Sequence, residues 1–242
     1  MNIIPLGIWG GYPKANSATS SFLIEEDGFY LLFDCGSGVL SSLQNHVNIQ
    51  QLDAVIITHY HHDHIADIGA LQYAKLIQNQ LAGKPKTLPV YAHNQDEHFQ
   101  TITFKEHMKA VNISHANQIG PFAIETIKTN HSAFCLAVRI EVNGKSVVFT
   151  ADTGWEPALI EFSKKADMLI SEANLYLPYE GQIPGHMTGR QAGLLAKEAG
   201  VEQLLLTHLP HFGETEDLVK EARQHFTKHV SLAEPGKNYV LA

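Results

Sequence analysis

The sequence contains few cysteines and few charged residues. Its two cysteines, Cys35 and Cys135, form no Cys-x-x-Cys pair, and two such residues imply no disulfide framework. Charged residues make up 17% of the chain and hydrophobic residues 44%. That balance is typical of a globular protein with a sizeable core and excludes a disordered chain.

Basic runs and long apolar runs are also missing, and the first residues do not resemble a signal peptide. Lysine and arginine number 17 against 25 aspartates and glutamates, a formal net charge of −8, which argues against a broad grip on nucleic acid. The residues Met1 to Pro5 lack the charged region of a signal peptide, and no apolar run approaches membrane-spanning length. We therefore expect a cytoplasmic enzyme that has no membrane partner.

The chain shows no linker, low-complexity segment or tandem repeat, so we expect one domain over residues 1–242. Hairpin turns are predicted at Asp27-Gly28 and Asn143-Gly144. Helices are predicted over about 65–81, closed by a stop signal at 83–86, over 94–110, and over 190–199, the last beginning with a capping box at 188–191. Antiparallel strands in each half with helices outside them favour two sheets packed face to face.

The most informative stretch is a histidine-rich turn. Residues 54–57 are apolar and predict a short buried strand, residues 65–76 suit a helix face, and between them stand Thr58-His59-Tyr60-His61-His62-Asp63-His64. Side chains two positions apart in an irregular turn can point the same way, so His59 and His61 can bind one ion while Asp63 and His64 bind a second. Imidazole with carboxylate suits zinc, manganese or iron.

Three later residues stand where strands end or meet. His131 lies between two predicted strands, Asp152 follows the apolar run Val147 to Thr150, and His208 follows the run Leu204 to Thr207. Each alone has a structural alternative, such as a simple turn for Asp152. A pair of metal ions that share a water needs about seven protein ligands, and these three would complete the four of the turn.

The turn matches the His-x-His-x-Asp-His signature, so the chain resembles the metallo-β-lactamase-fold hydrolases. The resemblance implies an α+β fold, a four-layer αββα sandwich with its site at one edge. It assigns His59, His61 and His131 to one metal ion, Asp63, His64 and His208 to a second, and Asp152 to both. Zinc is the first expectation, with manganese or iron as alternatives. Such a centre would attack an ester with a hydroxide that bridges the ions, Asp63 could also orient that nucleophile, and Asp34 would hold a ligating histidine.

Two further segments resemble ribonuclease Z and related phosphodiesterases. They are Ser171-Glu172-Ala173-Asn174 and Gly185-His186-Met187-Thr188. By this resemblance His186 contacts the scissile phosphate and Glu172 supports it by a hydrogen bond. For His186 alone, a histidine flanking a helix is the alternative. Arg190 is either a phosphate ligand or a solvated residue at a helix start.

One departure changes the expected substrate. Ribonuclease Z carries a long arm for tRNA between the positions that match His131 and Asp152, whereas here these two residues are only 21 positions apart. We therefore expect a small phosphodiester, such as a cyclic or short nucleotide, rather than extended nucleic acid. The alternatives are a carboxylic ester, thioester or lactone hydrolase, then a tRNA 3′ endonuclease, then a non-catalytic binding protein. A homodimer is a further expectation from the resemblance.

Overall fold

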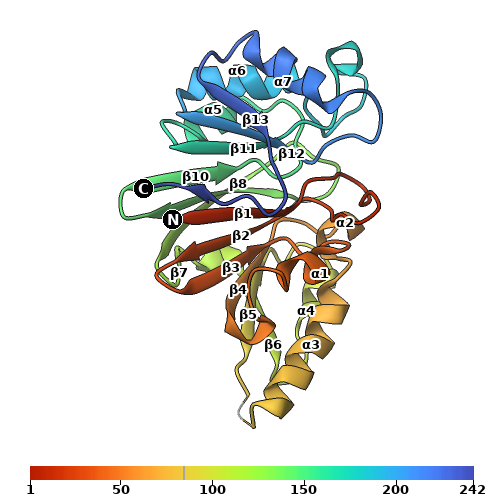
Figure 1. The fold of residues 1–242 in the computed structure, drawn as a ribbon, viewed down its shortest axis with the longest axis vertical. Coiled ribbons are helices and arrows are strands. Elements are labelled where there is room, and N and C mark those ends of the chain that lie inside the picture. Colours follow the sequence, from red (N-terminus) through yellow and green to blue (C-terminus); the bar gives the residue numbers. More distant parts are fainter. Residues whose placement is uncertain (84) are drawn as a thin grey trace. The chain divides into compact units, whose positions relative to one another are not determined.

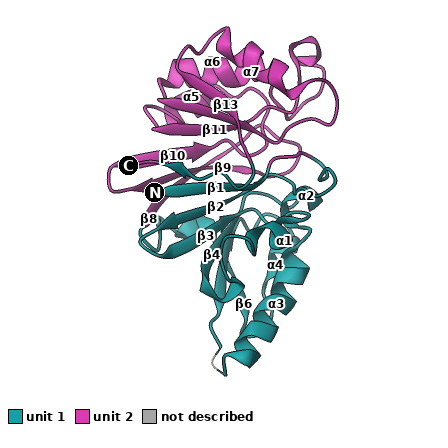
Figure 2. Cartoon of the chain, in the orientation of Figure 1, with its two compact units in different colours: residues 1–7, 11–121, 235–240 teal, residues 8–10, 122–234, 241–242 magenta. Residues whose placement is uncertain are grey.

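The computed structural model describes every residue of the chain except Lys84. Its contacts divide into two compact units, coloured separately in Figure 2. Unit 1 comprises Met1–Gly7, Gly11–Pro121 and Pro235–Val240, and unit 2 comprises Ile8–Gly10, Phe122–Glu234 and Leu241–Ala242. The expectation of one domain over the whole chain stays a prediction.

Unit 1 is built on a mixed sheet with the strand order β14-β1-β2-β3-β4-β5-β6. The pairs that involve β14, β1, β2 and β3 among themselves are antiparallel, and β3, β4, β5 and β6 run parallel to one another. The predicted Asp27-Gly28 turn joins β2 to β3, and both residues have positive φ angles, 51° and 78°, as a tight hairpin requires. The strands are β1 (Asn2–Gly7), β2 (Ser21–Glu26), β3 (Phe29–Phe33), β4 (Leu52–Ile57), β5 (Leu88–Ala92), β6 (Met108–Asn112) and β14 (Tyr239–Val240).

The strand β4 lies in the middle of this sheet because its residues are almost all apolar. A strand covered by neighbours on both edges and by side chains on both faces carries such a continuous apolar run. The helices α1, α3 and α4 lie along one face of the sheet (Figure 1), and Leu71 of α3 shares a buried cluster with Val55 and Val90. The helical segments of unit 1 are α1 (Val39–Leu43), η1 (Ile49–Gln51), α2 (His62–Ile65), α3 (Ile68–Leu81), α4 (His98–Ile102) and η2 (Ile113–His115), and a short strand β7 (Gln118–Ile119) follows them.

Unit 2 contains a second mixed sheet with the order β13-β12-β11-β10-β9-β8. Here β10, β11, β12 and β13 are parallel, while β8, β9 and β10 are antiparallel. The strands are β8 (Phe122–Lys128), β9 (Leu136–Val142), β10 (Lys145–Phe149), β11 (Met168–Glu172), β12 (Gln203–Thr207) and β13 (His229–Leu232). The helical segments are α5 (Ala158–Phe162), η3 (Leu177–Tyr179), α6 (Gly189–Ala199) and α7 (Thr215–Arg223).

The predicted boundaries of α6 are confirmed in detail. Thr188 accepts a hydrogen bond from the backbone of Gln191, whose side chain accepts one from the backbone of Thr188, which is the predicted capping box. Gly200 closes the helix with a φ of 68°, in the left-handed region that glycine adopts without strain. The turn at Asn143-Gly144, with φ angles of 52° and 74°, is also confirmed.

The prediction of a helix over residues 94–110 is wrong. Only His98–Ile102 is helical there, and Met108–Asn112 forms the edge strand β6 beside β5. The apolar residues of this segment fit a helical period by chance, and pairing with β5 overrides that local preference. The helix predicted over about 65–81 is confirmed as α3, which begins three residues later and ends at Leu81, whereas Ile65 ends the short helix α2. Its predicted stop at 83–86 includes Lys84, which lies outside the described residues.

Among the residues that the structure describes, no helix combines the length and the apolar character needed to cross a membrane.

Candidate metal centre

The candidate site residues stand at the carboxyl ends of parallel strands. In unit 1, Asp34 follows β3 and the histidine-rich turn follows β4, and in unit 2 Asp152 lies just beyond β10 and His208 follows β12. Parallel neighbours end at the same edge of a sheet, so each sheet gathers its polar side chains at one edge. The backbone is strained there, because Asp34, Ala151 and His208 all have positive φ angles between 50° and 59°.

The first four predicted ligands form one cluster in unit 1, which we call the unit-1 ligand group. The ring of His59 lies 4.1 Å from that of His64 and 4.7 Å from that of His61, measured between ring centroids. The Nε2 atom of His64 lies 3.5 Å from a carboxylate oxygen of Asp63. The unit-1 ligand group is His59, His61, Asp63 and His64.

Buried hydrogen bonds fix the rings of this group. Asp34, only 3% exposed, accepts from the backbone N–H of Thr58 at 2.8 Å, and its other oxygen lies 2.8 Å from Nδ1 of His64. The hydroxyl of Thr58 lies 3.1 Å from Nδ1 of His59. Since Nδ1 of both rings has a partner, Nε2 is the nitrogen that each presents to a metal ion. Asp34 therefore makes the hydrogen bond to a predicted ligand histidine that we expect from the sequence, and it does so with a positive φ angle.

Two glycines contact Asp63, and one of them must be glycine for its backbone to come so close. The backbone N–H of Gly11 donates to a carboxylate oxygen of Asp63 at 2.7 Å. A Cβ atom on Gly36 would lie 1.7 Å from the backbone oxygen of Asp63, so only glycine fits there.

The later predicted ligands form the unit-2 ligand group, which is His131, Asp152 and His208. Asp152 is its centre. One of its carboxylate oxygens lies 3.3 Å from Nε2 of His208 and 3.9 Å from Nε2 of His131, and all three side chains are at most 5% exposed. A buried carboxylate between two imidazole nitrogens suits a ligand shared by two cations.

Residues outside the unit-2 ligand group contact its two histidines and fix their positions. Nδ1 of His131 donates to the backbone oxygen of Gly185 at 3.0 Å. The amide nitrogen of Asn174 donates to the backbone oxygen of His208 at 2.9 Å and lies 3.4 Å from its Nδ1. A Cβ atom on Gly10 would lie 2.5 Å from that amide nitrogen and 2.7 Å from the His208 ring.

Glu172 and His186 make the hydrogen bond that the sequence predicts, with 2.9 Å between Nδ1 of His186 and a Glu172 oxygen. Glu172 is 1% exposed and also accepts from the backbone N–H groups of Thr153 and Met187 at 2.7 and 3.1 Å. The ring of His186 lies 5.5 Å from that of His208, nearly parallel to it, and 5.2 Å from that of His131. Glu172 therefore positions His186, which lies beside two of the predicted ligand histidines, His131 and His208.

Other candidates have structural partners instead. Arg190 forms an ion pair with Glu180 through two of its nitrogens, which occupies the guanidinium that could have bound phosphate. The hydroxyl of Tyr176 donates to the backbone oxygen of Phe212 at 2.8 Å, and burial raises the pKa of Tyr176 to about 12. His62, which lies between His61 and Asp63 and is not among the predicted ligands, is exposed.

The supporting residues Gly10, Gly36, Gly185 and Asn174 were not predicted. A glycine or an asparagine in a sequence does not reveal which distant atoms it approaches. The only available signal was the position of these residues in or beside the motifs.

The donor set fits divalent transition metals. Imidazole nitrogens and carboxylate oxygens, without thiolate, suit zinc, manganese and iron. In His59, His64 and His131, Nδ1 has a hydrogen-bond partner, which leaves Nε2 as the atom that would bind a metal ion.

Comparison with known proteins places the chain in a family. The model of the beta-lactamase superfamily domain matches residues 30–209. The chain is 47% identical over 239 residues to the probable metallo-hydrolase YhfI of Bacillus subtilis, covering 98% of each protein. The crystal structure of that metallo-beta-lactamase fold protein superimposes with a TM-score of 0.93 at 46% identity, again over 98% of each chain. A ribonuclease Z of Haloarcula marismortui is 25% identical, over 98% of this chain and 95% of its own.

The chain therefore belongs to the β-lactamase superfamily and has the metallo-β-lactamase fold. The predicted fold class is confirmed, with two mixed sheets and their helices. The class of metal-dependent hydrolase, predicted from the histidine motif, follows from this membership.

Proposed function

We propose that the unit-1 and unit-2 ligand groups bind the same two divalent metal ions, zinc first among them, and that the protein hydrolyses small phosphodiesters. The observation that carries the proposal is the His186–Glu172 pair, a non-ligand imidazole fixed beside two ligand histidines. When bound, the ions would supply an activated water and Lewis-acid stabilisation of the phosphoryl oxygens.

The resemblance to the family supports a division of the ligands between the two ions. His59, His61 and His131 would hold one ion, and Asp63, His64 and His208 the other. Asp152, whose one oxygen lies within 4 Å of both His131 and His208, would contact both ions. The hydrogen bonds from Asp34 and Gly185 hold their histidines in the orientation that binding needs.

His186 supplies the proton chemistry. Glu172 accepts the hydrogen bond from Nδ1, so Nε2 is the atom that contacts the substrate. A protonated Nε2 donates a hydrogen bond to the leaving oxygen of the phosphodiester. As the bond from phosphorus to the leaving oxygen breaks, that oxygen takes the proton from Nε2, which avoids release of an alkoxide. The buried Glu172 stabilises the imidazolium form that precedes this transfer.

The size of the substrate follows from the interval between His131 and Asp152. The hairpin of β9 and β10 occupies it, which leaves no room for an arm that grips tRNA. The net charge of −8 also disfavours a polyanion. A short or cyclic nucleotide is the substrate class that these features favour, and a cytoplasmic location agrees with it.

Hydrolysis of bis(p-nitrophenyl) phosphate by the zinc- and manganese-loaded protein tests this function. We expect turnover in the wild type, its loss in Asp63→Ala and His186→Ala, and its retention in His62→Ala, a neighbour of the ligands that is exposed. His186→Ala should keep the metal content of the wild type. No turnover by a fully metallated wild type would contradict the proposal and direct the search to esters, thioesters and lactones.

A further inference from the structure

Unit 1 contains a cavity beside the histidine-rich turn that the proposed chemistry does not use. Its volume is about 260 Å³, smaller than the pockets that enclose whole drug-sized ligands and suited to one ring system. Its lining includes Tyr60, Ile68, Gln72, His98, Thr101 and Ile102. These residues come from the turn itself and from α3 and α4.

The cavity adjoins the unit-1 ligand group through the backbone. Tyr60 stands between His59 and His61, and consecutive Cα atoms are about 3.8 Å apart. The cavity wall and two of the proposed ligands therefore belong to the same short turn.

The cavity has an aromatic wall. The rings of Tyr60 and His98 are nearly parallel, 21° apart, with their centroids separated by 5.8 Å. Tyr60 is buried, and its hydroxyl donates to the backbone oxygen of His93 at 2.6 Å, which fixes the ring. The His98 side chain is 43% exposed, so its ring extends the wall toward solvent and offers a face for stacking.

Hydrogen bonds keep this wall in place. Nδ1 of His98 lies 2.7 Å from an oxygen of Asp96, which also accepts from the backbone N–H of His98. That backbone hydrogen bond lowers the pKa of Asp96, so the carboxylate is charged at neutral pH. The amide nitrogen of Gln72 donates to the backbone oxygens of Thr101 and Ile102, which ties α4 to α3. The cavity is preformed, so a ligand need not order it.

We propose that this cavity, with the Tyr60–His98 wall, binds the heteroaromatic base of the nucleotide substrate. The proposal rests on the proposed function for its substrate class. It assigns His98, the first residue of α4, a role in substrate specificity through stacking on the base. Apolar contact with Ile68 and Ile102 covers the ring edge that the wall does not reach.

Calorimetric titration of the metal-loaded protein with adenosine 5′-monophosphate and with ribose 5-phosphate tests the proposal. The two probes share sugar and phosphate and differ in the base. We expect adenosine 5′-monophosphate to bind about tenfold more tightly, within the range that stacking of a base on an aromatic side chain provides. The advantage should fall below about threefold in His98→Ala and return in His98→Phe, which restores a ring. Metal-free protein should show the same dependence on His98.

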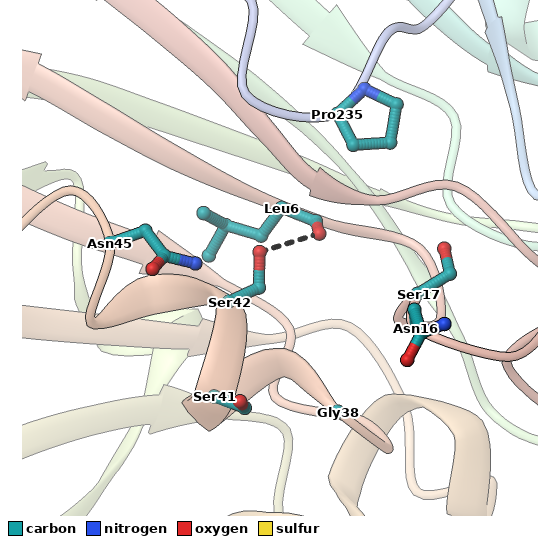
Figure 3. Close-up of a pocket in the computed structure, with 8 residues that line it drawn as sticks. All are labelled: Leu6, Asn16, Ser17, Gly38, Ser41, Ser42, Asn45 and Pro235. Carbon is teal, nitrogen blue, oxygen red and sulfur yellow. Dashed lines mark hydrogen bonds between the residues drawn. The ribbon is translucent and has the colours of Figure 1, made fainter.

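A second hollow of unit 1 supplies the control. It has a volume of about 420 Å³ and is lined by Leu6, Ser42, Asn45 and Pro235 among others. The hydroxyl of Ser42 donates a hydrogen bond to the backbone oxygen of Leu6 (Figure 3). Asn45→Ala should leave the tenfold advantage unchanged. Equal binding of the two probes by the wild type, or an advantage that persists in His98→Ala, would overturn the proposal. Base preference without hydrolysis would refute only the proposed function, and hydrolysis without base preference would refute only the base site.

Discussion

Replacing Gly10 with alanine perturbs the unit-2 ligand group without replacing any of its residues. The added Cβ atom would lie 2.5 Å from the amide nitrogen of Asn174 and 2.7 and 2.8 Å from two ring atoms of His208. Ordinary contacts are about 3.5 Å or longer, so the ring must shift by roughly 0.7 Å. Metal–ligand distances tolerate only about 0.2 Å. We therefore expect zinc affinity to fall about 10- to 100-fold, as for changes in residues that support a ligand.

Zinc affinity is measured by competition with a chelator, and stability by chemical unfolding of the metal-free protein. Overpacking of this kind costs about 1–3 kcal/mol, and hydrolysis should fall with metal occupancy. Gly69→Ala is the matched control, because a Cβ atom there meets nothing within 4 Å and alanine within helix α3 adds about 0.5–1 kcal/mol of stability. A Gly10→Ala protein with wild-type zinc affinity would refute the role given to His208.

Three other substitutions have definite expected outcomes. Glu172→Gln replaces a carboxylate oxygen that accepts from backbone N–H groups with an amide NH2 that cannot accept. We expect the free energy of unfolding to fall by about 1–3 kcal/mol. We also expect kcat to fall about 100-fold with metal content unchanged. Lys75 is fully buried, and burial lowers its pKa to about 8. Because the unfolded chain then binds more protons above pH 8, wild-type stability rises from pH 8 toward the ordinary pKa of about 10.4. Lys75→Met should be more stable than the wild type at pH 7, and urea unfolding should show this advantage shrinking by up to about 3 kcal/mol by pH 10.5. Thr188→Ala removes the cap of α6 and should lower the melting temperature through a loss of about 1 kcal/mol.

Much of the fold was predictable because local signals and tertiary structure agree. The apolar run of β4 is continuous, as a central strand requires, and the capping box at Thr188 fixes the start of α6. The segment 94–110 failed for the opposite reason. Its strand β6 is stabilised by pairing with β5, a partner that neighbouring residues do not reveal.

The predictability of the candidate site follows the same division. The unit-1 ligand group lies within six consecutive positions, so the spacing alone identifies it. Asp152 and His208 were identifiable because each lies at or just beyond the end of an apolar strand. Asn174 and Gly10 could not be predicted, because their importance comes from close approach to His208, which depends on how distant segments of the chain meet.

The central claim, that both ligand groups bind the same two ions, is tested most directly by counting bound zinc after dialysis against a fixed free concentration. We expect two ions per chain in the wild type. Asp152→Ala should lose both ions, although four of the seven proposed ligands lie in unit 1, because Asp152 would contact each ion. Retention of one or two tightly bound ions in that variant would contradict the shared centre.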